Sequence, residues 1–352
     1  MVVVSVQSPL LSAERFVLSA EQGNQLISFT EICTKKGLLA RPEGLGEDDC
    51  ADGLSDPATL LRYLSARQFD SDGALKQLED TIKFRQENQL VGLFDAIEVS
   101  DFEQARQFYP HWTGRRDKQG LPICMFDVGR LDKPALTLWE DTRNRKGWSD
   151  STKEKPSMLQ IASVFHDGLI RFVLPLCTMM TDRPNPSTAI TSSTYLADAS
   201  GLGLKQGWSL KTFAQEISWL LATCYPETIS KVLVCNAPSY FATIWKYLKK
   251  WIDPRTAEKI VVLTNTEALS VLQEYIDIEN IPKALGGEYD FTHGMLPIID
   301  DNIRNQFNWP VPGIPLPSGP IKLSKDANGA ISAVAVGEID GVQRRETIFS
   351  QV

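Results

Sequence analysis

Seven polar side chains spread along the chain are of the types that bind a phosphorylated polyol. They are Arg67, Gln68, Ser193, Tyr195, Glu227, Thr256 and Lys259. Arginine and lysine donate charge-assisted hydrogen bonds to phosphate, hydroxyl groups add directional contacts, and a carboxylate accepts hydrogen bonds from sugar or inositol hydroxyls. A purely structural ion pair is the commoner role for Glu227 and Lys259, because such pairs often tie a strand to a helix. The residue types alone leave both interpretations open.

Motifs for catalysis or metal binding are weak or absent in the sequence. The segment GLGLKQG, with Gly201, Gly203 and Gly207, lies between a predicted strand and a predicted helix. Its third glycine is one position late for a dinucleotide fingerprint, so we interpret it as a tight turn rather than the cofactor site of an oxidoreductase. The three histidines lack metal-ligand spacing, and no GxxxxGK[ST], GxSxG or HExxH motif occurs. We predict no catalytic residues, no metal site and no resident cofactor.

A buried strand followed by an amphipathic helix is the strongest structural pattern. Residues 231–235 (KVLVC) are apolar and β-branched, and NAP at 236–238 ends the run. Ser239 is placed to cap a helix that extends to Ile252. Six apolar side chains recur at helical spacing on one face: Phe241, Ile244, Trp245, Leu248, Trp251 and Ile252. Lysines mostly occupy the other face, so we expect this helix to cover protein core, lipid or a membrane surface.

Helical and strand patterns alternate along the middle of the chain. Helices are predicted at 13–36, at 57–64, after residue 70, at 158–174 and at 213–224, and strands at 121–129, 189–198, 231–235 and 259–263. This order favours an α/β fold with a mostly parallel or mixed sheet and covering helices, preceded by a small helical N-terminal region.

The C-terminal segment differs in composition from the rest. Between residues 309 and 320, five prolines and two glycines (WPVPGIPLPSGP) exclude regular structure and predict an extended linker on the surface. The last residues alternate in polarity around Asp340-Gly341, which indicates an edge hairpin, with a flexible tail as the alternative.

Composition limits the partners and the compartment. The chain has 352 residues and a net charge of −8, which argues against general nucleic-acid binding. No run reaches the roughly 18 apolar residues of a membrane span, and the N-terminus lacks a secretion signal. The six cysteines are widely spaced, as expected for reduced, buried thiols. We expect a cytoplasmic monomer with transient, peripheral membrane contact.

Four separated motifs resemble the CRAL-TRIO lipid-binding family, and most closely its phosphatidylinositol-transfer branch. They are TLLRYLSARQFD from Thr59, YPHWTGRRDKQGLPI from Tyr109, YPETISKVLVCNAP from Tyr225 with the following helix to DPRTAEKI, and IPKALGGEYD from Ile281. The resemblance covers roughly residues 57–289 in consistent order. It implies a helical N-terminal region (1–95), a CRAL-TRIO lipid-binding domain (96–295) and a C-terminal extension (296–352).

The resemblance also implies that the helix at 239–252 is a gate over the lipid cavity, and it implies roles for the polar residues. In phosphatidylinositol-binding members, the headgroup is held at positions that match Arg67, Glu227, Thr256 and Lys259. Gln68 and Thr228 stand where basic residues are expected. Ser193 matches a hydroxyl position used by phosphatidylcholine-binding members, whereas Tyr195 is larger than the usual threonine.

These matches imply a non-enzymatic carrier of phosphatidylinositol. Phosphatidylcholine or another hydrophobic lipid would be the second ligand, and the carrier would present lipid to membranes or lipid kinases. The alternative is a sensor or scaffold for a sterol, a squalene-like or tocopherol-like molecule, or haem. Tyr195 could ligate haem iron, although a strand tyrosine more often serves packing.

Overall fold

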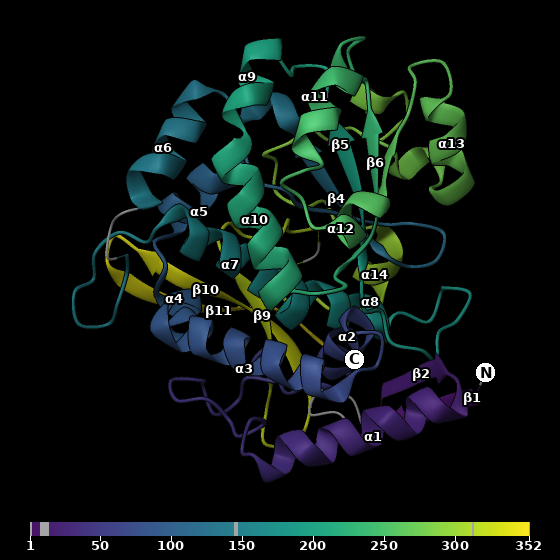
Figure 1. Cartoon of the computed structure of the whole chain (residues 1–352). Coiled ribbons are helices and arrows are strands. Elements are labelled where there is room, and N and C mark those ends of the chain that lie inside the picture. Colours follow the sequence, from purple (N-terminus) through teal and green to yellow (C-terminus); the bar gives the residue numbers. More distant parts are fainter. Residues whose placement is uncertain (1, 8–13, 144–146, 312, 352) are drawn as a thin grey trace.

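A five-stranded mixed sheet forms the centre of the fold (Figure 1). The computed structural model describes residues 2–7, 14–143, 147–311 and 313–351. The strands, in spatial order, are β3 (His111–Arg116), β4 (Pro122–Asp127), β5 (Ser193–Asp198), β6 (Ile229–Cys235) and β7 (Ile260–Val262). Only the pairing of β3 with β4 is antiparallel, so the predicted mostly parallel sheet is confirmed.

The two faces of the sheet are covered by different helices. Residues alternate along each strand, so Tyr195 and Ala197 face one side while Leu196 faces the other. The first face packs against α7 (Met158–Gly168), α8 (Leu174–Met179), α10 (Lys211–Cys224) and α11 (Phe241–Leu248), and α6 (Lys133–Arg143) packs in turn against α7 and α10. The opposite face is covered by α13 (Ala268–Tyr275). Short elements complete the connections: η1 (Val128–Arg130), α9 (Leu204–Ser209), α12 (Pro254–Glu258), η3 (Ile278–Asn280) and η4 (Lys283–Leu285).

The N-terminal region contains a hairpin that the helical pattern did not predict. β1 (Val2–Val6) pairs with β2 (Glu14–Leu18), and α1 (Ala20–Lys35) begins only after Ser19, which caps it. The predicted helix is therefore wrong over 14–18, and its predicted first residue, Ala13, lies outside the described residues. Other predicted helices are confirmed, and two more follow: α2 (Pro57–Ala66), α3 (Ser71–Glu87), α4 (Leu90–Ala96) and α5 (Val99–Arg106).

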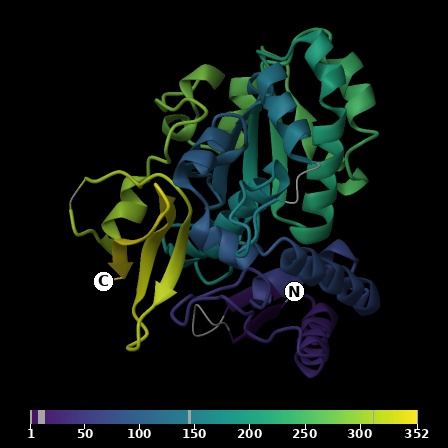
Figure 2. The same cartoon turned by 90° about the vertical axis from the view of Figure 1, so that its left-hand side faces the viewer.

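The C-terminal extension forms a folded sheet rather than a flexible tail. Its elements are α14 (Asp301–Asn305), β8 (Phe307–Asn308), β9 (Ile321–Lys325), β10 (Ile331–Ile339) and β11 (Val342–Gln351). Asp340 and Gly341 both have positive φ angles, which a tight two-residue hairpin turn requires, and the predicted hairpin is confirmed. The proline-rich segment is not wholly at the surface, because Leu316 is buried; Pro312 lies outside the described residues. Figure 2 shows these strands, in yellow, as a layer beside the central domain.

Buried charges join this sheet to the rest of the protein. Lys322 of β9 lies 2.7 Å from Asp49 and 2.6 Å from Asp95, and the Arg171 guanidinium also contacts Asp49, at 3.1 Å. The side chains of Asp49, Arg171 and Lys322 are each about 1% exposed. The network thus links the loop before α2, α4, the long core helix and the C-terminal sheet.

Among the residues that the structure describes, one helical segment is long and apolar enough to cross a membrane. It runs over Met158–Met179, but 78% of its most apolar window is buried inside the protein. The segment comprises α7, a π-helical turn, η2 (Leu169–Val173), and α8. Its burial identifies it as the core helix of the domain.

All three histidines are buried, which predicts an acid-sensitive fold. Burial lowers the pKa of His166 and His293 to about 4, and it holds the pKa of His111 well below the ordinary value. An unfolded histidine titrates near 6.5, so the unfolded chain binds more protons between pH 6.5 and 4. Stability is therefore full above pH 6.5 and falls as the pH drops.

Urea unfolding at pH 7 and pH 5 measures this loss. Each buried histidine is expected to lower the free energy of unfolding by about 2 kcal/mol at pH 5. His293→Phe, whose ring would lie beside Phe126 and His111, should reduce the acid loss by about that amount. An identical pH dependence in wild type and variant would contradict the assignment.

Candidate lipid-binding site

A polar cavity of about 300 Å³ lies where α2, α3, α10 and α12 approach the start of β6. Four predicted headgroup residues line it: Arg67, Glu227, Thr256 and Lys259. The chain brings them together from three separate segments, around residues 67, 227 and 256–259. Their proximity is the geometry that a shared site requires.

Lys259 and Glu227 form a half-buried ion pair. The Lys259 ammonium donates to Glu227 Oε2 at 2.6 Å and to the carbonyl of Ile229 at 2.8 Å. An ammonium carries three donors, so the third is available for a ligand oxygen. Lys259 can therefore form the structural ion pair and bind a ligand at the same time.

Arg67 lies at the C-terminal end of α2, and its orientation is fixed by α3. Its Nε donates to Gln77 Oε1 at 2.7 Å, and Gln77 in turn donates to the carbonyls of Ala222 and Thr223. The terminal guanidinium nitrogens are left for a ligand, since no described residue pairs with them. Gln77 thus holds an exposed arginine at the cavity rim.

The short helix α12 presents Thr256 and a further cation. Asp253 caps it by accepting from the backbone amides of Arg255 and Thr256, both at 3.1 Å. Arg255 lines the same cavity and donates to the carbonyls of Ser65 and Ala66. Arg255 is not among the predicted headgroup residues, because it lies at none of the positions that match the family's headgroup-binding residues.

The charges around the cavity suit a singly charged anion. Three cations, Arg67, Arg255 and Lys259, face two carboxylates, Glu227 and Asp253. A phosphodiester carries one negative charge and accepts several hydrogen bonds from such donors.

The other three predicted headgroup residues lie elsewhere. Gln68 is exposed and does not line the polar cavity. Ser193 is fully buried, and its hydroxyl donates to the carbonyl of Thr228 at 2.9 Å. Tyr195 is buried in the wall of a second, apolar cavity.

The apolar cavity has a volume of about 210 Å³ and lies between the sheet and the gate helix. Four predicted gate residues line it: Phe241, Trp245, Leu248 and Ile252. The opposite walls are aliphatic and aromatic side chains of β4, β5, β6 and α10, including Phe126, Ala197, Val234 and Ile217.

The gate helix is shorter than predicted. α11 covers Phe241–Leu248, so Trp251 and Ile252 lie in the turn that follows. Ser239 does not cap it; Tyr240 occupies the N-cap position and makes no side-chain capping bond. The helix packs closely against Gly207 of α9. A Cβ added to this glycine would lie only 2.8 Å from Ile244 Cδ1.

This contact explains two glycines of the GLGLKQG segment as packing residues. Gly207 admits Ile244 of the gate, and Gly201 lies against Gly129, where added Cβ atoms would approach within about 3 Å. Among the described residues, no cluster of three or more potential ligands could hold a metal ion. The predicted tight turn between strand and helix is confirmed only for residues 199–203, because residues 204–207 belong to α9.

The polar and apolar cavities are adjacent. Leu221, Ile229 and Thr256 line both of them. An amphiphilic molecule could accordingly place a charged headgroup among the cations and its hydrocarbon beneath the gate.

Comparison with known proteins identifies the family. The model of the CRAL/TRIO domain matches residues 107–287, slightly more than half of the chain. The chain belongs to the CRAL/TRIO family. The predicted family and fold are thereby confirmed, and the CRAL/TRIO region contains the sheet, the gate and most of both cavities.

Named CRAL/TRIO relatives are distant in sequence. The chain is 28% identical over 249 residues to "Phosphatidylinositol/phosphatidylcholine transfer protein SFH9" of Arabidopsis thaliana, which covers 68% of this chain but 38% of that protein. It is 24% identical to "SEC14 cytosolic factor" of Kluyveromyces lactis, covering 77% and 79%. The solved structure of Sfh5 has a TM-score of 0.54 at 14% identity, covering 82% of this chain and 97% of that one, and supports the fold.

Proposed function

We propose that this protein binds phosphatidylinositol and transfers it between membranes. The observation that carries the proposal is the shared wall between a cationic cavity and an apolar one, closed by α11. Relatives named as phosphatidylinositol/phosphatidylcholine transfer proteins and cytosolic factors add support. The protein would act in the cytoplasm as a non-enzymatic carrier, with phosphatidylcholine or another lipid as its second ligand.

The headgroup would enter the polar cavity. Arg67, Thr256 and Lys259 would donate to the phosphate, and Glu227 would accept from inositol hydroxyls. Arg255 would supply the charge that Gln68 and Thr228 lack, since it lines the same cavity from α12.

The hydrocarbon would occupy the apolar cavity while the gate is shut. About 30 methylene groups gain roughly 25 kcal/mol on leaving water, so an unprotected lipid cannot diffuse freely. The interior of a bilayer is as apolar as the cavity, so moving the hydrocarbon from one to the other changes its free energy little. Headgroup contacts and gate opening then determine selectivity and rate.

Membrane contact would occur where α9 and α11 meet. Leu204, Trp208, Tyr240 and Tyr247 are exposed there, and the rings of Trp208 and Tyr247 lie 4.4 Å apart. Exposed lysines surround them: Lys205, Lys211, Lys246, Lys249 and Lys250. We call these nine residues the docking surface. Aromatic side chains flanked by lysine suit an anionic bilayer surface.

The docking surface gives a test of transfer. The double variant Trp208→Ser/Tyr247→Ser should slow phosphatidylinositol transfer between anionic vesicles about tenfold, because losing even about 1.4 kcal/mol of interfacial affinity has that effect. The amount of lipid bound at equilibrium should not change. Val342→Ser, which alters an exposed residue on the distant C-terminal hairpin, is the control. Equal transfer rates in all three proteins would count against this surface.

The second candidate, a sensor or scaffold for an apolar cargo, has one favourable observation. Thr228 is buried and its hydroxyl donates to the carbonyl of Tyr225, so it offers the headgroup no charge. Arg255 offsets that loss in the same cavity, which favours the phospholipid.

A further inference from the structure

A third cavity, of about 80 Å³, continues the apolar one beyond Tyr195. Tyr195, Pro110 and His166 line both cavities. Since about 10–15 Å³ of such space suffices for one water molecule, the third cavity has room for a few methylene groups. We call it the distal chamber.

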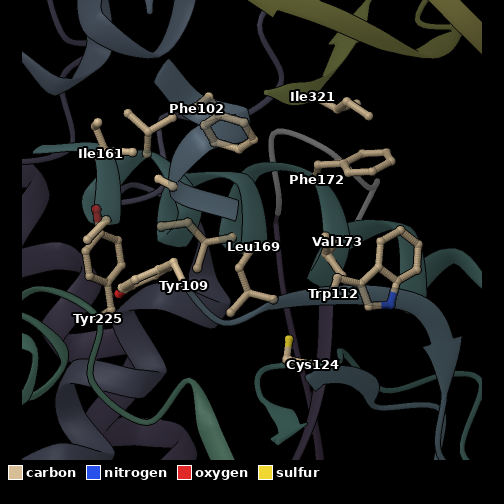
Figure 3. Packing of buried hydrophobic residues seen from close by; sticks show 14 of the residues in the cluster. Phe102, Tyr109, Trp112, Cys124, Ile161, Leu169, Phe172, Val173, Tyr225 and Ile321 are labelled. Carbon is tan, nitrogen blue, oxygen red and sulfur yellow. The ribbon is translucent and has the colours of Figure 1, made fainter. Parts of the chain in front are cut away.

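The distal chamber is enclosed by two parts of the chain that are far apart in sequence. On the domain side, its walls include Trp112 of β3, Cys124 of β4 and Phe172 of the core helix. On the other side lie residues of the C-terminal extension: Leu316, Pro317, Gly319, Pro320 and Ile321. Figure 3 shows Ile321 beside Phe172, with Leu169 and Val173 between them and Cys124. The extension lies outside the CRAL/TRIO match, so this wall is contributed by other sequence.

Most polar groups in the lining are already paired, and among the described residues His111 Nε2 is buried there without a hydrogen-bond partner. Arg106 donates to Glu103 at 2.7 and 3.0 Å and stacks on Phe102 and Phe165. His166 contacts the Tyr109 hydroxyl at 2.8 Å, and His111 contacts the Tyr109 carbonyl at 3.0 Å. Burial lowers the pKa of both histidines, so they are neutral at pH 7. The rest of the lining is mostly apolar, as hydrocarbon requires.

The core helix is deformed where it borders the distal chamber. Pro175 lacks the amide that would bond to the carbonyl of Arg171, and the helix widens into the π-helical turn η2 just before it. Gly168 precedes this turn with ordinary helical angles, φ −58° and ψ −38°. Gly168 lines the chamber, and a Cβ added to it meets no atom within 4 Å. The absence of a side chain at Gly168 and the widened helical turn thus leave the distal chamber open at this point.

We propose that the distal chamber binds the end of one hydrocarbon chain of the lipid, and that the C-terminal extension, as its outer wall, limits the chain length accepted. This inference rests on the proposed function. In this proposal the extension selects the lipid by the length of its hydrocarbon chain, which the headgroup site does not do.

Filling the chamber from Gly168 tests the proposal. The full-length protein and its Gly168→Ala, Gly168→Leu and Gly168→Phe variants would be incubated with vesicles that contain equal amounts of dimyristoyl, dipalmitoyl and distearoyl phosphatidylinositol. Native mass spectrometry then gives the ratio of bound species. Helical angles at residue 168 accept any of these side chains, and alanine is a better helix former than glycine. The alanine and leucine variants keep the test informative if phenylalanine prevents folding.

The expected result is a stepwise change in the bound species. With phenylalanine, the ratio of distearoyl to dimyristoyl lipid should fall at least tenfold, with leucine giving an intermediate change. Gln104→Leu, on the solvent face of α5 outside the chamber, should match wild type. An unchanged ratio in the folded leucine and phenylalanine variants overturns the inference and leaves the proposed function standing. Wild type that takes up none of the three lipids overturns both.

Discussion

Replacing Lys259 by alanine is expected to reduce phosphatidylinositol transfer at least tenfold. A hydrogen bond to a charged partner contributes about 1.5–3 kcal/mol, which corresponds to roughly 10- to 150-fold in affinity. The substitution also leaves Glu227 without its cation, 2.6 Å away in the native protein, and this carboxylate would then repel the phosphate. Transfer of labelled phosphatidylinositol between vesicles measures the effect.

The fold should survive this substitution, because the ion pair is partly solvated. The side chains of Lys259 and Glu227 are 24% and 28% exposed. Exposed pairs stabilise proteins by about 0–1 kcal/mol, so the midpoint of thermal unfolding should change little. Lys283→Ala removes a surface lysine paired with Asp290 and serves as the matched control. Transfer by Lys259→Ala equal to that of the control would remove Lys259 from the proposed site.

Replacing Lys322 by methionine is expected to lower the free energy of unfolding by about 3–5 kcal/mol. Removing one partner from a buried ion pair leaves the other charge uncompensated in a medium of low dielectric constant. Lys322 pairs with both Asp49 and Asp95, and Arg171 would be left to balance Asp49 alone. Methionine keeps most of the side-chain volume, so the loss reports on charge rather than on a cavity.

Urea denaturation of Lys322→Met beside Lys283→Met separates this effect from general lysine loss. In the control pair, the side chains of Lys283 and Asp290 are 60% and 89% exposed. Removing this pair should change the free energy of unfolding by less than about 1 kcal/mol. A similarly small change in Lys322→Met would mean that the C-terminal sheet folds independently of the domain. The distal chamber would then lack a firmly held wall.

Local patterns predicted the central domain well. The apolar run at 231–235 and the helical spacing from Phe241 to Leu248 each correspond to an observed element. These signals are strong because β6 is buried within the sheet and α11 has one apolar face, so burial determines their residue types directly. The family motifs then brought Arg67, Glu227, Thr256 and Lys259 to one predicted site, and the structure places all four around one cavity.

Long-range contacts account for what the sequence did not predict. In the sequence, Lys322 resembles an ordinary lysine of a strand. Its burial depends on Asp49, which lies 273 residues earlier. The hairpin β1–β2 lies next to a helix of similar composition, so the boundary at Ser19 was missed. Gly168 looks like a weak helix position, and the chamber that it lines is bordered on its other side by residues of the C-terminal extension, which are distant in sequence.

Identification of the lipid that copurifies with the protein tests the central claim most directly. Native mass spectrometry of the purified full-length chain, followed by organic extraction and analysis of the released ligand, gives both stoichiometry and identity. The account predicts one phospholipid per chain, with phosphatidylinositol among the species and its loss in Lys259→Ala. A sterol, another apolar molecule or haem in its place would contradict the account and assign the cavity to a different cargo.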